Sequence, residues 1–242
     1  MEFQVVSDLH LKNNDDFELK ITAPYLILAG DIGYPFTAIF WKFIEYVSVK
    51  YNHVYFVPGN HEFYGQTPEV ADEFLRNSFE RYKNITYMNG DCVELEKIVL
   101  IGSILWSHVP KECDKVSRNF GPHKNILKFS VKERNSVFEA ATAWIEGRAG
   151  SFPGKKIILI THYAPLCHES CHPKHDGDLK NHDYGTDLYK LIDVSNIDLF
   201  IYGHTHYNYK GNVLRRREGL YVSNQRGTRP SENFNPEFSF KY

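Results

Sequence analysis

The sequence has few cysteines, no long apolar run and almost no net charge, and each shortage excludes a class of protein. Four cysteines in 242 residues are too sparse for the disulfide framework of a small secreted domain, so we expect reduced thiols. No apolar run approaches the roughly 20 residues that a membrane span needs. A net charge of -2 gives no sign of a nucleic-acid or other polyanionic partner.

We also expect no targeting signal at the N-terminus. The first segment, MEFQVVSDLH, carries Glu2 and has none of the apolar stretch of a secretory leader. We therefore expect a cytoplasmic protein with no membrane partner. A local basic group at residues 214–217 is typical of a solvated hairpin and is weaker as a specific anion site.

The composition is that of an ordinary globular protein. Apolar residues make up 42% of the chain and charged residues 24%, which excludes a disordered chain. No internal repeat, low-complexity tract or linker interrupts the sequence. The length suits one domain with a large core, and we predict a single domain over residues 1–242. Twelve histidines are more than usual for this length, so their positions matter.

Short apolar, β-branched runs predict the strands. They are nearly continuous and do not alternate with polar residues, which is typical of strands buried on both faces in a sheet covered by helices. The predicted strands are residues 3–6, 25–29, 54–57, 98–105, 157–160, 199–202 and 219–222. Segments with helical spacing lie between them and predict helices over residues 36–51, 67–82, 131–149 and 187–192.

A polar cluster follows five of these runs, at the point where each predicted strand ends. In chain order the clusters are SDLH, GDIG, PGNHE, THYAP and GHTH. Ligands of α/β sheets sit at the carboxyl ends of the strands. A single cluster of this kind would be only a turn or a helix cap, but five in the same relative place predict a site.

Imidazole and carboxylate side chains in these clusters predict a metal centre. Their mixture suits Mn, Fe, Zn, Ni or Co better than Ca or Mg, which prefer oxygen ligands alone. Seven ligands are too many for one tetrahedral ion and suit two ions about 3.5–4 Å apart with a bridging carboxylate, a pair that activates water and polarises a phosphoryl group. The candidate ligands are Asp8, His10, Asp31, Asn60, His162, His204 and His206.

Residues next to these ligands have their own predicted roles. Glycines at positions 30, 59 and 203 let the backbone turn sharply beside the ions. In the tight turn after residue 57, Asn60 can face a metal while His61 faces the substrate, where it can donate a proton or stabilise the phosphoryl oxygens. Glu62 either orients His61 or supports a metal ligand.

The set of motifs resembles that of the calcineurin-like metallophosphoesterases. That family carries D-x-H, G-D, G-N-H-[DE], a lone H and G-H-x-H, and this chain has Asp8-Leu9-His10, Gly30-Asp31, Gly59-Asn60-His61-Glu62, His162 and Gly203-His204-Thr205-His206. The resemblance implies an α/β fold, a four-layer α/β/β/α sandwich with a dimetal centre at the carboxyl ends of the strands. It also implies a division of the ligands. Asp8, His10 and His206 would hold one ion, and Asn60, His162 and His204 the other. Asp31 would bridge the two ions, and His61 would be the catalytic acid.

Sequence differences set this chain apart from two branches of the family. Pro58 stands where the protein phosphatases of this superfamily carry an arginine, and GDIGYPF lacks their Asp-Arg-Gly signature. His10 stands where the lariat-debranching branch usually has cysteine. The segment NQRGTRPSENFNPEF at residues 224–238 is similar to the tail of small stand-alone members of the family, whose substrates are mostly unassigned.

Three features are candidates for substrate selection. Residues 166–185 form a polar stretch predicted to lack regular structure and to act as a lid, and their cysteines and histidines are a weaker candidate for a further zinc site. Residues 106–129 mix Phe120 with basic residues that would line a phosphate pocket or form an exposed loop. Arg226 follows the last predicted strand and would reach a substrate phosphate.

The sequence thus predicts a hydrolase, a dinuclear metal-dependent phosphoesterase that acts on a small-molecule or nucleotide ester. A phosphodiesterase is slightly favoured over a phosphomonoesterase (a phosphatase), because small members without the protein-phosphatase signature often cleave diesters. The alternative is a catalytically silent metal-binding scaffold of the same fold. The complete ligand set, with His61 present, favours the enzyme, since scaffold versions typically lose several of these residues.

Overall fold

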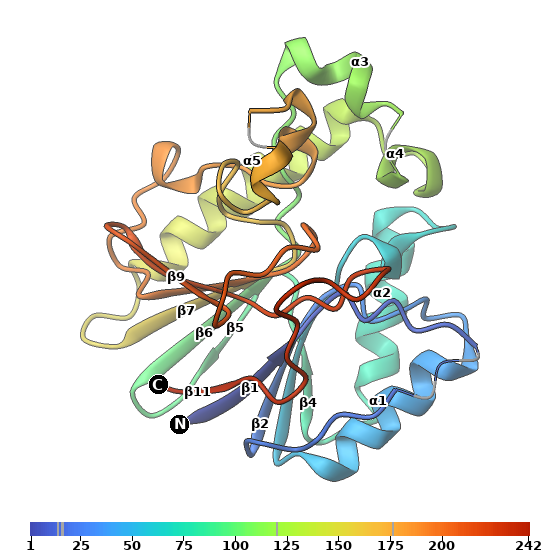
Figure 1. Ribbon diagram of the computed structural model, residues 1–242, viewed down its shortest axis with the longest axis vertical. Coiled ribbons are helices and arrows are strands. Elements are labelled where there is room, and N and C mark those ends of the chain that lie inside the picture. The colour runs from blue at the N-terminus through green and yellow to red at the C-terminus, as the bar shows by residue number, and fades with distance from the viewer. Residues whose placement is uncertain (14, 16, 120, 176) are drawn as a thin grey trace.

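The computed structural model describes residues 1–13, 15, 17–119, 121–175 and 177–242. Two β-sheets pack face to face, with helices on the outer face of each (Figure 1). The first sheet has the strand order β11-β1-β2-β3-β4, in which β1 to β4 are parallel and β11 runs antiparallel to β1. Its strands are β1 (Glu2–Val6), β2 (Tyr25–Ala29), β3 (His53–Val57), β4 (Ile85–Tyr87) and β11 (Ser239–Lys241).

The second sheet has the strand order β5-β6-β7-β8-β10-β9. Its four inner strands are parallel, and an antiparallel strand borders them on each side. The strands are β5 (Asp91–Glu94), β6 (Ile98–Ser103), β7 (Lys156–Thr161), β8 (Leu199–Tyr202), β9 (Val213–Arg216) and β10 (Gly219–Ser223).

Three apolar cores hold the layers together. The inner core lies between the sheets and includes Phe3, Ile27, Leu100 and Ile160, all fully buried. Helices α1 (Ala38–Lys50) and α2 (Pro68–Phe79) contribute to the core outside the first sheet. Helix α5 (Val131–Ala149) contributes to the core outside the second. The predicted four-layer α/β/β/α sandwich is therefore confirmed.

Local signals explain where the helices begin. The Thr67 side chain accepts a hydrogen bond from the backbone N–H of Val70, and Pro68 is the first residue of α2. Ser130 and Glu133 form a reciprocal capping box at the start of α5. The helices predicted over residues 36–51, 67–82 and 131–149 are thus present, whereas residues 187–192 contain only a 3₁₀ turn, Leu188–Lys190.

All seven predicted strands are present, and the basic hairpin expected at residues 214–217 is formed by β9 and β10. The sequence interpretation missed β4, β5 and β11 and gave β9 only as part of that hairpin; these four strands have three or four residues each. Each of these four lies at an edge of its sheet, where one-sided pairing and partial burial weaken the apolar pattern. The chain ends meet beside β1, where the backbone N–H of Tyr242 donates to the carbonyl of Met1 (Figure 1).

The two segments expected to be irregular contain short helices. Residues 106–129 include Lys111–Cys113, α3 (Asp114–Ser117) and α4 (Gly121–Asn125). Residues 166–185 include the 3₁₀ turns Pro173–His175 and Leu179–Asp183. Phe120, which the sequence singled out, lies outside the described residues. In the part of the chain that the structure describes, no helix has the length and apolar character to cross a membrane.

Candidate metal centre

The predicted ligands meet at the carboxyl ends of strands from both sheets. Asp8 and His10 follow β1, Asp31 follows β2, and Asn60 follows β3. From the second sheet, residue 162 follows β7 directly, and residues 204 and 206 follow β8. β1, β2 and β3 are parallel neighbours in the first sheet, and β7 and β8 are parallel neighbours in the second. The carboxyl ends of these strands therefore lie at one edge of each sheet, as the sequence predicted.

Five of the seven candidates have a backbone conformation that side chains rarely adopt. Their φ angles are positive, and each such residue costs of order 1–3 kcal/mol where a β-carbon is present. Strain of this kind persists only where the surrounding structure imposes it and is concentrated at functional sites. The φ angles are 53° for Asp8, 45° for His10, 53° for Asp31, 72° for His204 and 52° for His206.

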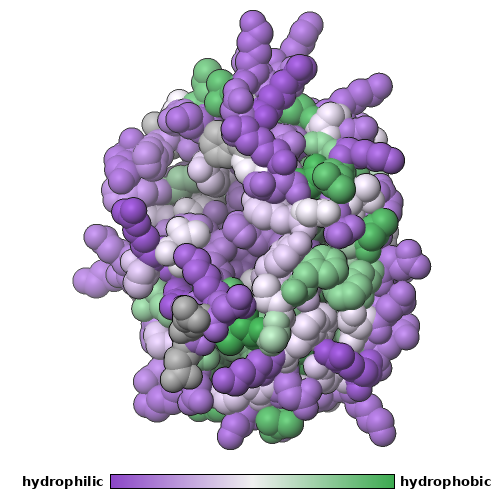
Figure 2. Space-filling view, turned by 90° about the vertical axis from the view of Figure 1, so that its right-hand side faces the viewer, coloured by the Kyte–Doolittle hydropathy of each residue, from purple (hydrophilic) through white to green (hydrophobic). Residues whose placement is uncertain are grey.

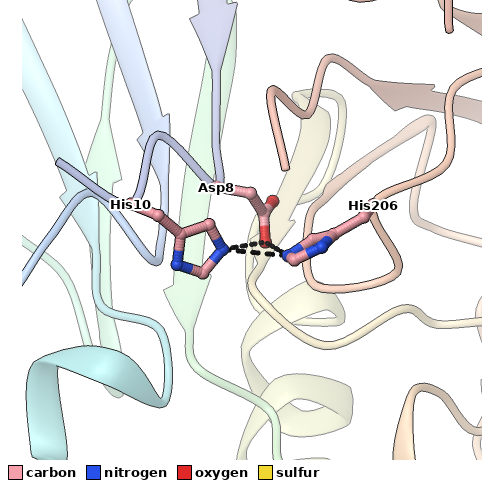
Figure 3. Close-up of side chains that lie close together, drawn as sticks. All are labelled: Asp8, His10 and His206. Carbon is pink, nitrogen blue, oxygen red and sulfur yellow. Dashed lines mark hydrogen bonds and ion pairs between the residues drawn. The ribbon is translucent and has the colours of Figure 1, made fainter. Parts of the chain in front are cut away.

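The first group of side chains is Asp8, His10 and His206, which point toward one another (Figure 3). The Nε2 atoms of the two histidines are 2.9 Å apart. Asp8 Oδ1 lies 3.4 Å from the Nε2 atom of His206 and 3.9 Å from that of His10. A single proton can be shared between the two histidine nitrogens, but it does not explain why the Asp8 oxygen also points to the same place. A bound cation explains the convergence of all three donor atoms.

The second group is Asp31, His162 and His204, with Asn60 beside it. The Nε2 atom of His162 lies 3.3 Å from Asp31 Oδ1 and 3.2 Å from Asn60 Oδ1. The Asn60 amide nitrogen donates to the Tyr64 hydroxyl, 2.8 Å away, which leaves the Asn60 oxygen facing the histidine. Oxygen and nitrogen atoms of three residues therefore converge on one point.

Backbone carbonyls orient two of these imidazole rings. The Nδ1 atom of His162 lies 3.0 Å from the Ala29 carbonyl, and the Nε2 atom of His204 lies 3.2 Å from the Asp183 carbonyl. A carbonyl only accepts, so each of these nitrogens carries a proton, and in the neutral ring the opposite nitrogen keeps a lone pair. This is the arrangement in which metal-binding histidines are held in proteins, and the residues fit a divalent transition metal.

Burial and charge oppose each other within the centre. Burial lowers the pKa of His10 to about 4 and that of His204 well below its ordinary value, so both rings are neutral. For His162, burial is outweighed by the Asp31 carboxylate, which raises the pKa of the ring to about 9. In turn, His162 holds the pKa of Asp31 well below its ordinary value although burial opposes this. Asp31 thus requires positive charge beside it, which a proton on His162 or a metal ion supplies.

Glu62 supports the centre through the backbone. Its Oε2 atom accepts the N–H groups of Asp31, at 2.9 Å, and Gly59, at 2.6 Å, and its Oε1 atom accepts that of Gly33, at 3.1 Å. Burial and the neighbouring Asp31 charge raise the pKa of Glu62 to about 7. Of the two roles that the sequence left open, the contacts favour support of a metal ligand, because Glu62 joins the loops after β2 and β3.

His61 lies on the open side of the centre. Its Nε2 atom is 3.8 Å from Asp31 Oδ2, and its side chain is 36% exposed. The ring packs between those of His10 and Tyr64, with centroid distances of 4.5 and 4.4 Å. A cavity of about 590 Å³ contacts His61, Asp31 and Asn60, so His61 faces the space where a substrate would bind.

A buried arginine that the sequence analysis did not identify supports His204. Arg134 is fully buried and donates to both the Asp183 carboxylate, at 3.0 Å, and the Asp183 carbonyl, at 3.1 Å. That carbonyl is the one that faces His204. Arg134 falls on the apolar face of α5, with Val131 and Phe138, and a charged residue at that spacing is the signal that was available.

The predictions for Arg226 and for residues 166–185 have different outcomes in the geometry. Arg226 lies outside the cavity: its Nη1 atom donates to the Leu9 carbonyl and lies 3.5 Å from Asp15 Oδ2. The cysteines and histidines of residues 166–185 do not gather into a metal-binding group among the described residues. Residues of the same segment line the cavity beside the metal centre, which is the position expected for a lid over the site.

Comparisons with known proteins agree with this fold. A family model described as calcineurin-like phosphoesterase matches residues 1–208. An uncharacterised protein of Acanthamoeba polyphaga mimivirus is 29% identical over 268 residues, which cover 96% of this chain and 93% of that protein.

Solved structures show the same fold at low identity. The phosphopantetheinyl hydrolase of Mycobacterium tuberculosis has a TM-score of 0.71 and 17% identity, covering 93% of this chain and 89% of that one. A dimetal phosphatase from Danio rerio has a TM-score of 0.53 and 14% identity, covering 92% and 86%. The architecture is thus that of a metallophosphoesterase. The chain belongs to the calcineurin-like phosphoesterase family.

Substituting Gly59→Ala tests the packing of the centre. A β-carbon at this position would approach Asp31 and the His162 ring closer than 3.0 Å, so we expect a loss of about 1–3 kcal/mol of unfolding free energy and weaker metal binding. Gly147→Ala is the control, because α5 has open space there and alanine is favoured by up to about 1 kcal/mol in a helix. Equal effects of the two changes in denaturant titrations would contradict the close packing.

Substituting Arg134→Met tests the buried ion pair. It leaves the Asp183 carboxylate, 2% exposed, without its partner, and breaking such a pair costs about 3–5 kcal/mol. Denaturant titration measures the loss, and adding Asp183→Asn should recover part of it because no charge is then left unpaired. Arg148→Met, an exposed arginine of the same helix, should change the stability by less than about 0.5 kcal/mol.

Proposed function

We propose that this protein hydrolyses a phosphate ester with two divalent transition-metal ions bound at the described centre. The observation that carries the proposal is that two groups of ligands meet at one carboxylate. Asp31 Oδ1 lies 3.3 Å from His162 in one group, and Asp31 Oδ2 lies 3.8 Å from His10 at the border of the other. A carboxylate whose two oxygens face different groups is placed to bridge a pair of ions.

In this proposal each side chain of the centre has a role. Asp8, His10 and His206 hold one ion, and Asn60, His162 and His204 the other, with Asp31 between them. Two ions held there would lower the pKa of water to generate a nucleophile and would neutralise charge on the phosphoryl group. Glu62 and the backbone carbonyls keep the ligands in position, so little rearrangement is needed when the substrate binds.

His61 is proposed as the catalytic acid or transition-state stabiliser. Its side chain borders the cavity and is packed against Tyr64, so an ester bound over the ions would contact it. There it donates a proton to the leaving oxygen or a hydrogen bond to the phosphoryl oxygens. The Asp31 carboxylate lies 3.8 Å from the His61 Nε2 atom, so the ring is held beside the proposed bridging ligand.

The substrate is proposed to be a small molecule or a nucleotide, with a diester slightly favoured over a monoester. The ions are proposed to be Mn, Fe, Zn, Ni or Co, because the ligands combine imidazole with carboxylate. We also propose that residues 1–242 act as one domain, supported by the core that both sheets share. A cytoplasmic location is supported by the cysteines, none of which forms a disulfide among the described residues.

Metal-stripped protein should hydrolyse neither bis(p-nitrophenyl) phosphate nor p-nitrophenyl phosphate, and adding back Mn²⁺, Ni²⁺, Co²⁺ or Zn²⁺ should restore turnover. Mg²⁺ should restore less, since imidazole ligands suit it poorly. Initial rates with each ion measure the effect, and the ratio of the two esters decides between diester and monoester. Tight metal binding with no turnover of any ester would instead support the scaffold.

Two substitutions separate the proposed roles. His61→Ala should retain both metals and the fold and lose about 10²–10⁴-fold in kcat, as expected when a general acid is removed. Asp31→Asn should weaken both metals together, because the bridging charge is lost. Metal content and kcat are measured side by side, with His108→Ala as the control, since His108 lies outside this cavity. Full activity of either site variant would reject the role assigned to it.

A further inference from the structure

The cavity beside the metal centre extends well beyond the proposed ligands. Its volume of about 590 Å³ lies in the range of about 300–1,000 Å³ typical of small-molecule sites. One side is formed by the centre itself, and the opposite wall by residues of the ranges 171–175 and 178–184 together with α4. The face that carries α2 and α4 is hollowed in its upper half, and hydrophilic side chains stand around the hollow (Figure 2).

Basic side chains are concentrated on this opposite wall. Lys174, Lys180, His172 and His175 all line the cavity and come from nine consecutive positions. Among the described residues, neither lysine forms an ion pair, whereas Lys190, just beyond this segment, pairs with Asp187 at 2.8 Å. Two ammonium groups that have no ion-pair partner among the described residues therefore face the same space as the centre.

Among the described residues, no carboxylate of the wall forms an ion pair with either lysine. Asp183 is buried and committed to Arg134 and to the Ser117 hydroxyl. The Asp178 carboxylate accepts the backbone N–H of Lys180 at 2.9 Å and starts the turn Leu179–Asp183. Asp31, at the far side, is the proposed bridging ligand. In the described part of the wall, two ammonium groups therefore face one carboxylate, Asp178, that has no cationic partner there.

We propose that this wall is a binding subsite for a second anionic group of the substrate. The inference rests on the proposed function and narrows it to phosphoesters whose organic part carries another phosphate. The ester to be cleaved lies over the centre, and the second phosphate lies against Lys174 and Lys180 at the other end of the cavity. Ammonium groups bind phosphate as point charges, so the subsite selects for charge and accepts organic parts of different shapes.

Competition assays test the subsite while the metals stay in place. The readout is turnover of the p-nitrophenyl ester. We expect fructose 1,6-bisphosphate to inhibit it at least about tenfold more strongly than fructose 6-phosphate. Adenosine 3′,5′-bisphosphate should likewise inhibit at least about tenfold more strongly than adenosine 5′-monophosphate. In the double variant Lys174→Ala, Lys180→Ala this difference should fall below about twofold. The kcat/KM for the nitrophenyl ester, which lacks a second phosphate, should stay within about twofold of wild type.

The control variant Lys50→Ala, Lys97→Ala removes the same charge from exposed positions outside the cavity. It should keep the full preference for bisphosphates, which separates a local subsite from a change in overall charge. Equal inhibition by bisphosphates and monophosphates in the wild type would overturn the subsite, as would a preference that survives in the cavity variant. Failure of the wild type to turn over the nitrophenyl ester with any metal would instead reject the proposed function.

Discussion

The Asp31 carboxylate is the group on which the rest of the centre depends. It lies beneath the meeting point of the two sheets, 1% exposed, with one oxygen toward His162 and the other toward His10 and His61. A buried carboxylate is stable only when it is paired. In this site the pairing comes from histidines that belong to both sheets, so the two halves of the fold must pack in one arrangement to satisfy it.

The surrounding structure holds Asp31 in a conformation that it would not adopt alone. Its φ of 53° is unfavourable, and the Glu62 carboxylate restrains its N–H together with that of Gly59. The Asp31 side chain in turn accepts the N–H of His61 at 2.9 Å. Each loop of the first sheet therefore restrains the next, and the strain is offset by hydrogen bonds that form only in the folded chain.

A second layer of support comes from the other sheet. Arg134 on α5 fixes Asp183, whose carbonyl orients His204. The same contact anchors one end of the segment that forms the basic wall of the cavity. The position of the ligand and that of the wall are therefore coupled through one buried arginine, which links the packing of α5 to the space available for a substrate.

The sequence by itself determined the seven main strands and the place of the candidate ligands at the strand ends, and the family resemblance implied the four layers. Continuous apolar runs must be buried on both faces, and polar residues directly after them must lie at the strand ends. Only the tertiary structure decided the contacts across the chain. Arg226 contacts Leu9 and Asp15, and Glu62 accepts hydrogen bonds from backbone amides. The contacts of Arg226 and Glu62 involve residues distant in the sequence, and local sequence patterns cannot predict such packing.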